Sequence, residues 1–223
     1  MGNMKTKDRM PVYYPIFLNL SGKKCVVVGG GEVALRKVRA LLEHGGDVLV
    51  ISPELCSELV RLSKNTETHV LNREYQTGDL DGAFTAIAAT GNLGINRQVM
   101  QEARKRAVLV NIVDDAENSD FIVPSHLRRG DVTIAISTAG RSPSLARKIR
   151  TKLEKDFGDE YATLALLINE VRAEVNKQGI KINGDVWQEV LDLDLLASLV
   201  AKGDNEKAKT ILLSNLETQR TKD

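Results

Sequence analysis

A run of β-branched residues that breaks into three glycines constrains this chain more than any other stretch of its sequence. Residues 26–28 are all valine, Gly29, Gly30 and Gly31 follow, and an amphipathic helical pattern begins at Glu32. The spacing from Gly29 is G-x-G-x-x-A, in which the first glycine permits a tight strand-to-helix turn and the second lets the backbone approach a pyrophosphate. An ordinary glycine-rich turn is the alternative, but both the strand and the helix that the motif requires are present. The stretch therefore predicts a dinucleotide-binding βαβ unit.

Strand and helix patterns alternate through the first half of the chain. Strands are predicted near residues 14–20, 24–28, 47–51, 69–74, 84–89 and 108–113, and helices near 32–44, 53–63 and 95–106. The first two strands are expected to pair as a hairpin, and the unbroken apolar run at 108–113 is typical of a strand covered on both faces. This alternation predicts an α/β fold with a doubly wound parallel sheet of the Rossmann type.

The pattern changes after residue 115. Residues 121–127 and 132–137 predict an antiparallel hairpin, and Ser142 and Pro143 have the residue types of a helix N-cap and first helical position. Helical patterns then continue to about residue 216. We expect a mobile segment at 1–13, an NAD-binding domain at 14–115, a hairpin and basic helix at 116–156, and a helical domain at 157–223.

The composition excludes several classes of protein. Of the 223 residues, 42% are hydrophobic and 27% are charged, which is typical of a globular protein. The sequence has no apolar run of membrane-spanning length, and the polar residues 1–10 do not resemble a secretion signal, so we expect a cytoplasmic protein. Cys25 and Cys56 are far apart and are expected to be core residues, and the three histidines have no metal-ligand spacing. We therefore expect neither a disulfide nor a resident metal.

Basic residues are concentrated in one part of the chain. The net charge is +1, but residues 126–155 contain eight arginines and lysines and only two acidic residues. This segment is poor in the aromatic side chains on which nucleic-acid bases commonly stack. The segment therefore favours a polyanionic small molecule over a nucleic acid, with a solvated basic face as the alternative.

Two further segments are expected at the carboxyl ends of the strands. The turn Ser52-Pro53-Glu54-Leu55 has no arginine or lysine, and Glu54 would repel a ribose phosphate, so NAD is favoured over NADP. Thr90 follows the buried strand at 84–89, where it either lines the cofactor or belongs to a simple polar loop.

Asp114 and Asp115 follow the strand at 108–113, at the edge of the sheet where open α/β folds bind ligands. One of these carboxylates could accept a proton while a nicotinamide accepts a hydride. The alternative is that Asp114 ends the strand in a solvated turn.

A set of motifs in one order makes the chain similar to a known family. The motifs are Tyr14-Pro15-Ile16-Phe17, Val26 to Ala34, Ala86 to Thr90, Asn111 to Asp114, Phe121 to Ser125 and Ser142 to Ala146. Over roughly residues 14–153 the chain resembles the precorrin-2 dehydrogenase / sirohydrochlorin ferrochelatase family, the dehydrogenase module of siroheme synthases.

The resemblance implies NAD-dependent oxidation of precorrin-2 to sirohydrochlorin by a homodimer. Asp114 matches the acidic residue implicated in dehydrogenation and, in bifunctional members, in inserting a metal such as Fe²⁺ or Co²⁺; the sequence leaves this chelatase activity open. The cofactor positions carry over to Gly29, Gly30, Gly31, Glu32, Val33, Pro53 and Glu54. The residues expected to hold the carboxylates of precorrin-2 are Arg128, Arg129, Arg141 and Arg147, with Thr138 where some members have a serine.

Two other functions remain open. An NAD-sensing regulatory module, such as the ligand-binding domain of a potassium-transport regulator, has a similar length, but it usually carries an aspartate where this chain has Ser52. A dehydrogenase for another polyanionic small molecule is the second. The chain is too short to include the methyltransferase module fused in some siroheme synthases, so we expect another enzyme to supply precorrin-2.

Overall fold

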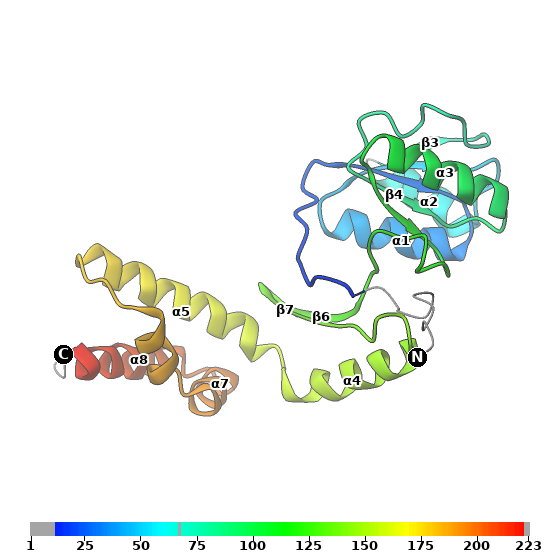
Figure 1. Ribbon diagram of the computed structural model, residues 1–223. Coiled ribbons are helices and arrows are strands. Elements are labelled where there is room, and N and C mark those ends of the chain that lie inside the picture. Colours follow the sequence, from blue (N-terminus) through cyan, green and yellow to red (C-terminus); the bar gives the residue numbers. More distant parts are fainter. Residues whose placement is uncertain (1–11, 67, 221–223) are drawn as a thin grey trace, which may run out of the picture. The chain divides into compact units, whose positions relative to one another are not determined.

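The computed structural model describes residues 12–66 and 68–220, and the chain divides into two units between Val123 and Pro124. The N-terminal unit contains a parallel sheet with helices, and the C-terminal unit contains an antiparallel hairpin and further helices (Figure 1). Of the segment that is expected to be mobile, residues 1–11 lie outside the described residues.

Five parallel strands form the sheet of the N-terminal unit, in the order β3-β2-β1-β4-β5. The strands are β1 (Lys24–Val28), β2 (Asp47–Ile51), β3 (His69–Leu71), β4 (Thr85–Ala88) and β5 (Leu109–Ile112), and the helices are α1 (Glu32–Glu43), α2 (Ser57–Asn65) and α3 (Leu93–Lys105). Helix α1 packs against β1 and β2, whereas α3 packs against β4 and β5. The predicted doubly wound sheet of the Rossmann type is confirmed (Figure 1).

The central strand β1 is buried on both faces, which explains its unbroken apolar sequence. Successive side chains of a strand point to opposite faces, so Val26 and Val28 pack in the α3 layer while Cys25 and Val27 pack with α1 and α2. Cys25 is a core residue, as predicted. Burial raises the pKa of its thiol to about 11, and the nearby Asp47 adds to the effect, so this cysteine is unreactive.

The strand predicted at residues 14–20 does not form. Residues 12–20 have no regular secondary structure, and Tyr14 and Phe17 are largely exposed. The prediction was wrong because β1 already pairs with β2 on one side and β4 on the other, so it has no free edge to form a hairpin. Only the turn before β1 was correct, with Gly22 at φ 64°.

Residues 119–121 cover the free edge of β5. The amides of Val110 and Ile112 donate to the side-chain oxygens of Asp120 (2.9 Å) and Ser119 (2.8 Å), and the Asn111 side chain donates to the Phe121 carbonyl (2.9 Å). Side chains thus satisfy backbone groups that an edge strand would otherwise leave open to another chain. These bonds also close the turn that carries Asp114.

The C-terminal unit begins with the antiparallel hairpin of β6 (Ser125–Arg129) and β7 (Val132–Ile136). The hairpin starts later than predicted because Phe121 lies along β5 instead. The helices are α4 (Pro143–Asp156), α5 (Glu160–Lys177), α6 (Gly184–Val190), α7 (Leu193–Ala201) and α8 (Asn205–Arg220). Ser142 caps α4 as predicted, accepting from the Leu145 amide at 3.2 Å.

Helices α5 to α8 enclose their own apolar core, which includes Leu164, Val171, Leu196 and Leu212. Helix α4 packs instead against β6 and β7, so the basic helix and the hairpin form one layered element. Across the described residues, none of the helices has both the length and the apolar character needed to cross a bilayer.

Candidate functional site

A cleft of about 620 Å³ opens at the carboxyl ends of β1, β2 and β4, the edge at which open α/β sheets bind ligands. Its walls are residues 28–31 after β1, 51–56 after β2 and 89–92 after β4, together with Glu74, Tyr75 and Ile95. The predicted cofactor residues that line it are Gly29, Gly30, Gly31, Pro53, Glu54 and Thr90. The other two, Glu32 and Val33, lie outside its lining, in the first turn of α1.

The three glycines are required for three different reasons. Gly29 has φ 127°, and a Cβ there would overlap the Ala89 carbonyl. A Cβ on Gly30 would overlap the Glu54 carbonyl, so Gly30 is needed for the packing of two turns against each other. A Cβ on Gly31 would meet no described atom within 4 Å, so this glycine leaves open space at the cleft.

Hydrogen bonds join the glycine turn to the turn after β2. The Cys56 amide donates to the Gly30 carbonyl (2.8 Å), and the buried Ser52 hydroxyl donates to the Glu54 carbonyl (2.7 Å). These bonds hold residues 53–55 in an irregular turn, so the helix predicted at 53–63 begins only at Ser57. Cys56, expected in the core, precedes α2, where it is half-buried against the core and also lines the cleft.

The loop after β4 is held by Asn96, a buried residue that the sequence analysis missed. The Thr90 hydroxyl donates to the Asn96 side-chain oxygen (2.6 Å), and the Asn96 amide group donates to the Thr90 carbonyl (3.1 Å). Thr90 therefore lines the cleft with its hydroxyl already engaged by the protein. Asn92 caps α3 in the same loop, accepting from the Gly94 and Ile95 amides.

The helix N-termini around the cleft differ in how their first amides are satisfied. The side chain of Asn92 caps α3, but the N-cap of α1 is Gly31, which has no side chain to accept a hydrogen bond. The amides of the first turn of α1 are thus available at the open space beside Gly31. A helix N-terminus of this kind binds phosphate through its amides and its positive dipole end.

Asp114 and Asp115 have different environments. Asp115 is half-buried, and its carboxylate accepts from the backbone amide (3.2 Å) and side-chain amide (2.8 Å) of Asn118. Asp114 is exposed and has φ 62°, an uncommon conformation for a residue other than glycine. Strained residues of this kind are frequent at functional sites, so the geometry favours Asp114 over Asp115 as the reactive carboxylate.

Lys37 of α1 has an electrostatic interaction with Asp114. Burial lowers the pKa of Lys37, the neighbouring Arg36 lowers it further, and the Asp114 carboxylate opposes both effects. Asp114 does not line the cleft, but it follows β5, so it belongs to the same carboxyl edge of the sheet. Sequence reasoning missed Lys37 because the helical pattern of α1 does not indicate which of its polar residues interacts with a turn that is far away in the sequence.

The basic residues predicted for the substrate lie in the C-terminal unit, where some already have partners. Arg129 is half-buried and donates from Nε to the Phe157 carbonyl (3.0 Å), and the Thr138 hydroxyl accepts from the Ser142 amide (3.0 Å). Arg128 donates from Nε to the Gly130 carbonyl but is exposed, as are Arg141 and Arg147. The exposed guanidinium groups are therefore the more accessible ones for an anion.

Two family models match successive parts of the chain. The one described as "Putative NAD(P)-binding" matches residues 16–125, and the one described as "Sirohaem biosynthesis protein central" matches residues 129–155. The chain is 41% identical over 207 residues to a siroheme synthase of Photorhabdus laumondii, and 38% identical over 204 residues to one of Photobacterium profundum. The chain is therefore similar to siroheme synthases, with an NAD(P)-binding segment followed by a sirohaem biosynthesis central segment.

These matches cover 92% and 91% of this chain but 44% and 43% of the two relatives, so the chain spans less than half of their length. A solved structure titled "SirC, precorrin-2 dehydrogenase" has the same fold, with a TM-score of 0.71 over 92% of this chain and 100% of that chain at 24% identity. The resemblance inferred from the motifs and the expectation of a nicotinamide dinucleotide site are confirmed at the level of NAD(P).

Proposed function

We propose that the chain is an NAD-dependent dehydrogenase that oxidises precorrin-2 to sirohydrochlorin. The observation that carries this proposal is the uncapped N-terminus of α1, which opens onto the cleft beside Gly31 in a chain that is similar to siroheme synthases. Its amides would bind the pyrophosphate, while the bound NAD would supply the hydride acceptor. The remaining chemistry, proton removal and substrate binding, falls to side chains of this protein.

The charge of the cleft supports NAD rather than NADP. Glu54 and Glu74 both line it, and of the described residues in its lining none is arginine or lysine. Two carboxylates would repel a ribose phosphate, whereas a carboxylate can accept hydrogen bonds from ribose hydroxyls. NAD is therefore the proposed cofactor, held by Gly29, Gly30, Gly31, Pro53, Glu54 and Thr90, with Glu32 and Val33 supplying backbone in the first turn of α1.

We assign proton removal to Asp114 and substrate binding to the basic residues. The exposed Asp114 carboxylate accepts the proton that precorrin-2 loses as its hydride is transferred. Arginine is suited to carboxylates because its guanidinium binds them in a bidentate geometry. Arg128, Arg141 and Arg147 would bind them directly, and Arg129 and Thr138 would shape the same surface from their half-buried positions.

A homodimer is part of the proposal. The hairpin packs on α4, but Leu127 is the only buried residue of β6 and β7, and no third strand joins them within the described residues. On α4, Leu145 and Ile149 are one turn apart, and 52% and 37% of their surfaces are exposed. A second copy that covers this apolar surface would complete the core of the hairpin region.

The proposal is tested by following NADH formation after NAD and freshly prepared precorrin-2 are mixed with the protein. We expect the parent to produce NADH, and Asp114→Ala to lose about 100-fold or more in rate while binding NAD as before. Glu117→Ala, an exposed carboxylate of the same turn, is the matched control and should remain active. A parent that binds NAD but forms no NADH would instead be a sensor or a dehydrogenase of another substrate. Adding Fe²⁺ or Co²⁺ to sirohydrochlorin and recording its absorbance would test chelation with the same variants.

A further inference from the structure

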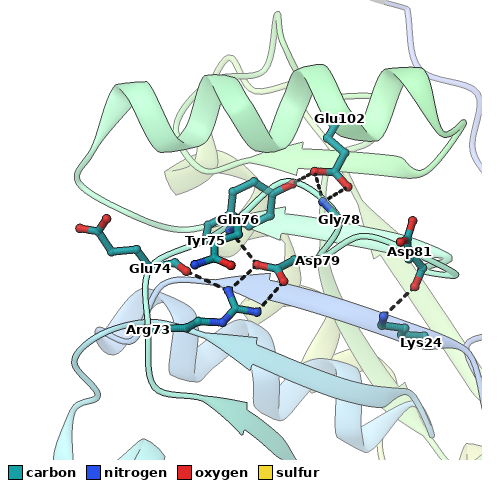
Figure 2. Close-up of polar contacts among 9 residues, drawn as sticks. All are labelled: Lys24, Arg73, Glu74, Tyr75, Gln76, Gly78, Asp79, Asp81 and Glu102. Carbon is teal, nitrogen blue, oxygen red and sulfur yellow. Dashed lines mark hydrogen bonds and ion pairs between the residues drawn. The ribbon is translucent and has the colours of Figure 1, made fainter.

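The loop between β3 and β4 supplies a wall of the cleft that the sequence analysis did not anticipate. Glu74 and Tyr75 of this loop line the cleft, beside the turn that carries Glu54. Figure 2 shows the Glu74 carboxylate pointing away from the polar network formed by the rest of the loop. The residue immediately before it, Arg73, has the side-chain type that binds the ribose phosphate of NADP in other dinucleotide sites.

Arg73 is held inside the loop instead. Its two terminal nitrogens donate to the two carboxylate oxygens of Asp79 at 2.8 and 2.7 Å, and one of them also donates to the Glu74 carbonyl at 2.9 Å (Figure 2). Asp79 also accepts from the Gln76 amide (2.8 Å), and only 9% of its side chain is exposed. A bidentate pair with one partner so deeply buried has a single well-defined geometry.

A second set of contacts anchors the loop to α3. The hydroxyl of the buried Tyr75 donates to Glu102 at 2.5 Å, and the Gly78 amide donates to the same carboxylate (Figure 2). Arg106 also donates to this carboxylate, from Nε at 2.8 Å. Burial alone would raise the pKa of Glu102, but the hydrogen bonds that its carboxylate accepts have a larger combined effect and lower the pKa. Glu102 is therefore a charged acceptor. The Arg73–Asp79 pair therefore belongs to a loop fixed from two sides.

We propose that Asp79 determines cofactor specificity, because it withholds Arg73 from the cleft and leaves Glu54 and Glu74 as the charged groups that face the ribose. This inference rests on the proposed function, since it requires that the cleft bind a dinucleotide. Asp79 itself touches no cofactor and acts only through Arg73. Arg73 directly precedes Glu74, which lines the cleft. Without Asp79, its guanidinium could therefore pair with a ribose phosphate.

Titrations with NADH and NADPH, followed by the fluorescence of the nicotinamide, test the proposal without any turnover. For Asp79→Asn we expect NADPH to bind roughly tenfold more tightly, the effect of about one added charged hydrogen bond, and NADH to bind within about twofold of the parent. The gain should disappear in Arg73→Ala combined with Asp79→Asn. Asp81→Asn is the control, because Asp81 belongs to the same loop but pairs with Arg106. An unchanged NADPH affinity in folded Asp79→Asn would overturn the inference.

A second variant gives an answer even if Asp79→Asn does not fold. Arg73 is already withheld from the cleft in the parent, so Arg73→Ala should change NADPH affinity by no more than about twofold; losing one charged hydrogen bond would cost roughly tenfold. A large loss would show that Arg73 reaches the cofactor and would refute the proposal. A parent that binds neither dinucleotide would refute the proposed function and this inference together, whereas a parent that binds NADH without these variant effects refutes the inference alone.

Discussion

The cleft of the N-terminal unit and the hairpin region of the C-terminal unit are organised in opposite ways. The cleft is built from backbone turns that hydrogen bonds and close packing hold in place, after strands whose side chains are mostly buried. In β6 and β7 only Leu127 is buried, and the neighbouring α4 exposes apolar and basic side chains together. The N-terminal unit thus completes its own core, whereas the hairpin region leaves apolar and basic surface exposed for a ligand or a second copy. Backbone turns preform a cleft of fixed shape, whereas the exposed side chains of the hairpin region stay accessible to an anion or to a second copy.

The largest effect is expected from substitutions of the glycines at the cleft of the N-terminal unit. Gly30→Ala should lower the free energy of unfolding by about 3 kcal/mol, because the new methyl group would overlap the Glu54 carbonyl and the Ser52 hydroxyl. Gly31→Ala should leave stability nearly unchanged but weaken NAD binding about tenfold, since its methyl group would occupy the open space at the cleft. Urea unfolding and NADH titration measure the two effects. Equal stabilities for both variants would contradict the different roles assigned to the two glycines, with Gly30 needed for packing and Gly31 for space at the cleft.

Self-association through the hairpin region can be disrupted without disturbing the cleft. Replacing Leu145 and Ile149 with aspartate should weaken self-association at least tenfold, because a charge would replace exposed apolar surface worth about 1 kcal/mol per side chain. Leu93→Asp, at an exposed apolar position of α3, is the control and should not change the association state. Sedimentation velocity over a range of concentrations gives the result. A parent that is monomeric throughout would remove the homodimer from the proposal.

A smaller effect is expected at Asp114, the strained position of the N-terminal unit. Asp114→Gly should raise the free energy of unfolding by about 1 kcal/mol, because glycine adopts φ 62° without steric cost. The same change should slow NADH formation about 100-fold or more, since the proposed proton acceptor is removed. Asp114→Ala retains the strain and lacks the carboxylate, so it separates the two effects in urea unfolding. A loss of stability in the glycine variant would show that the turn is not strained.

The smallest effect is the response of the cleft wall to acid. Hydrogen bonds from Arg73 lower the pKa of Asp79, and the pKa of Glu102 is lowered despite its burial. A carboxyl group with a lowered pKa in the folded state stabilises the fold above its unfolded pKa of about 4, and this stability is lost as the pH falls through the folded value. Combining Asp79→Asn with Glu102→Gln should therefore reduce the loss of thermal stability between about pH 5 and about pH 3. Equal losses in parent and variant would contradict these pKa directions.

The fold and most of the cleft were predictable because their signals are local. A valine run, three glycines and a helical pattern are contiguous, and the residues that line the cleft follow strands that the apolar pattern identifies. The strand predicted at 14–20 was wrong because pairing depends on which edges are already occupied, and no local pattern contains that information.

The sequence by itself determined that this chain forms a dinucleotide-binding sheet followed by a basic hairpin and helices, because side-chain periodicity and glycine spacing act over a few residues. Only the tertiary structure decided which of two adjacent aspartates is exposed, that Lys37 interacts with it electrostatically, and that Asp79 holds Arg73. Contacts such as Tyr75 with Glu102 join residues from a loop and a helix that are separate in sequence. Their energies depend on burial and geometry, which exist only once the chain has folded.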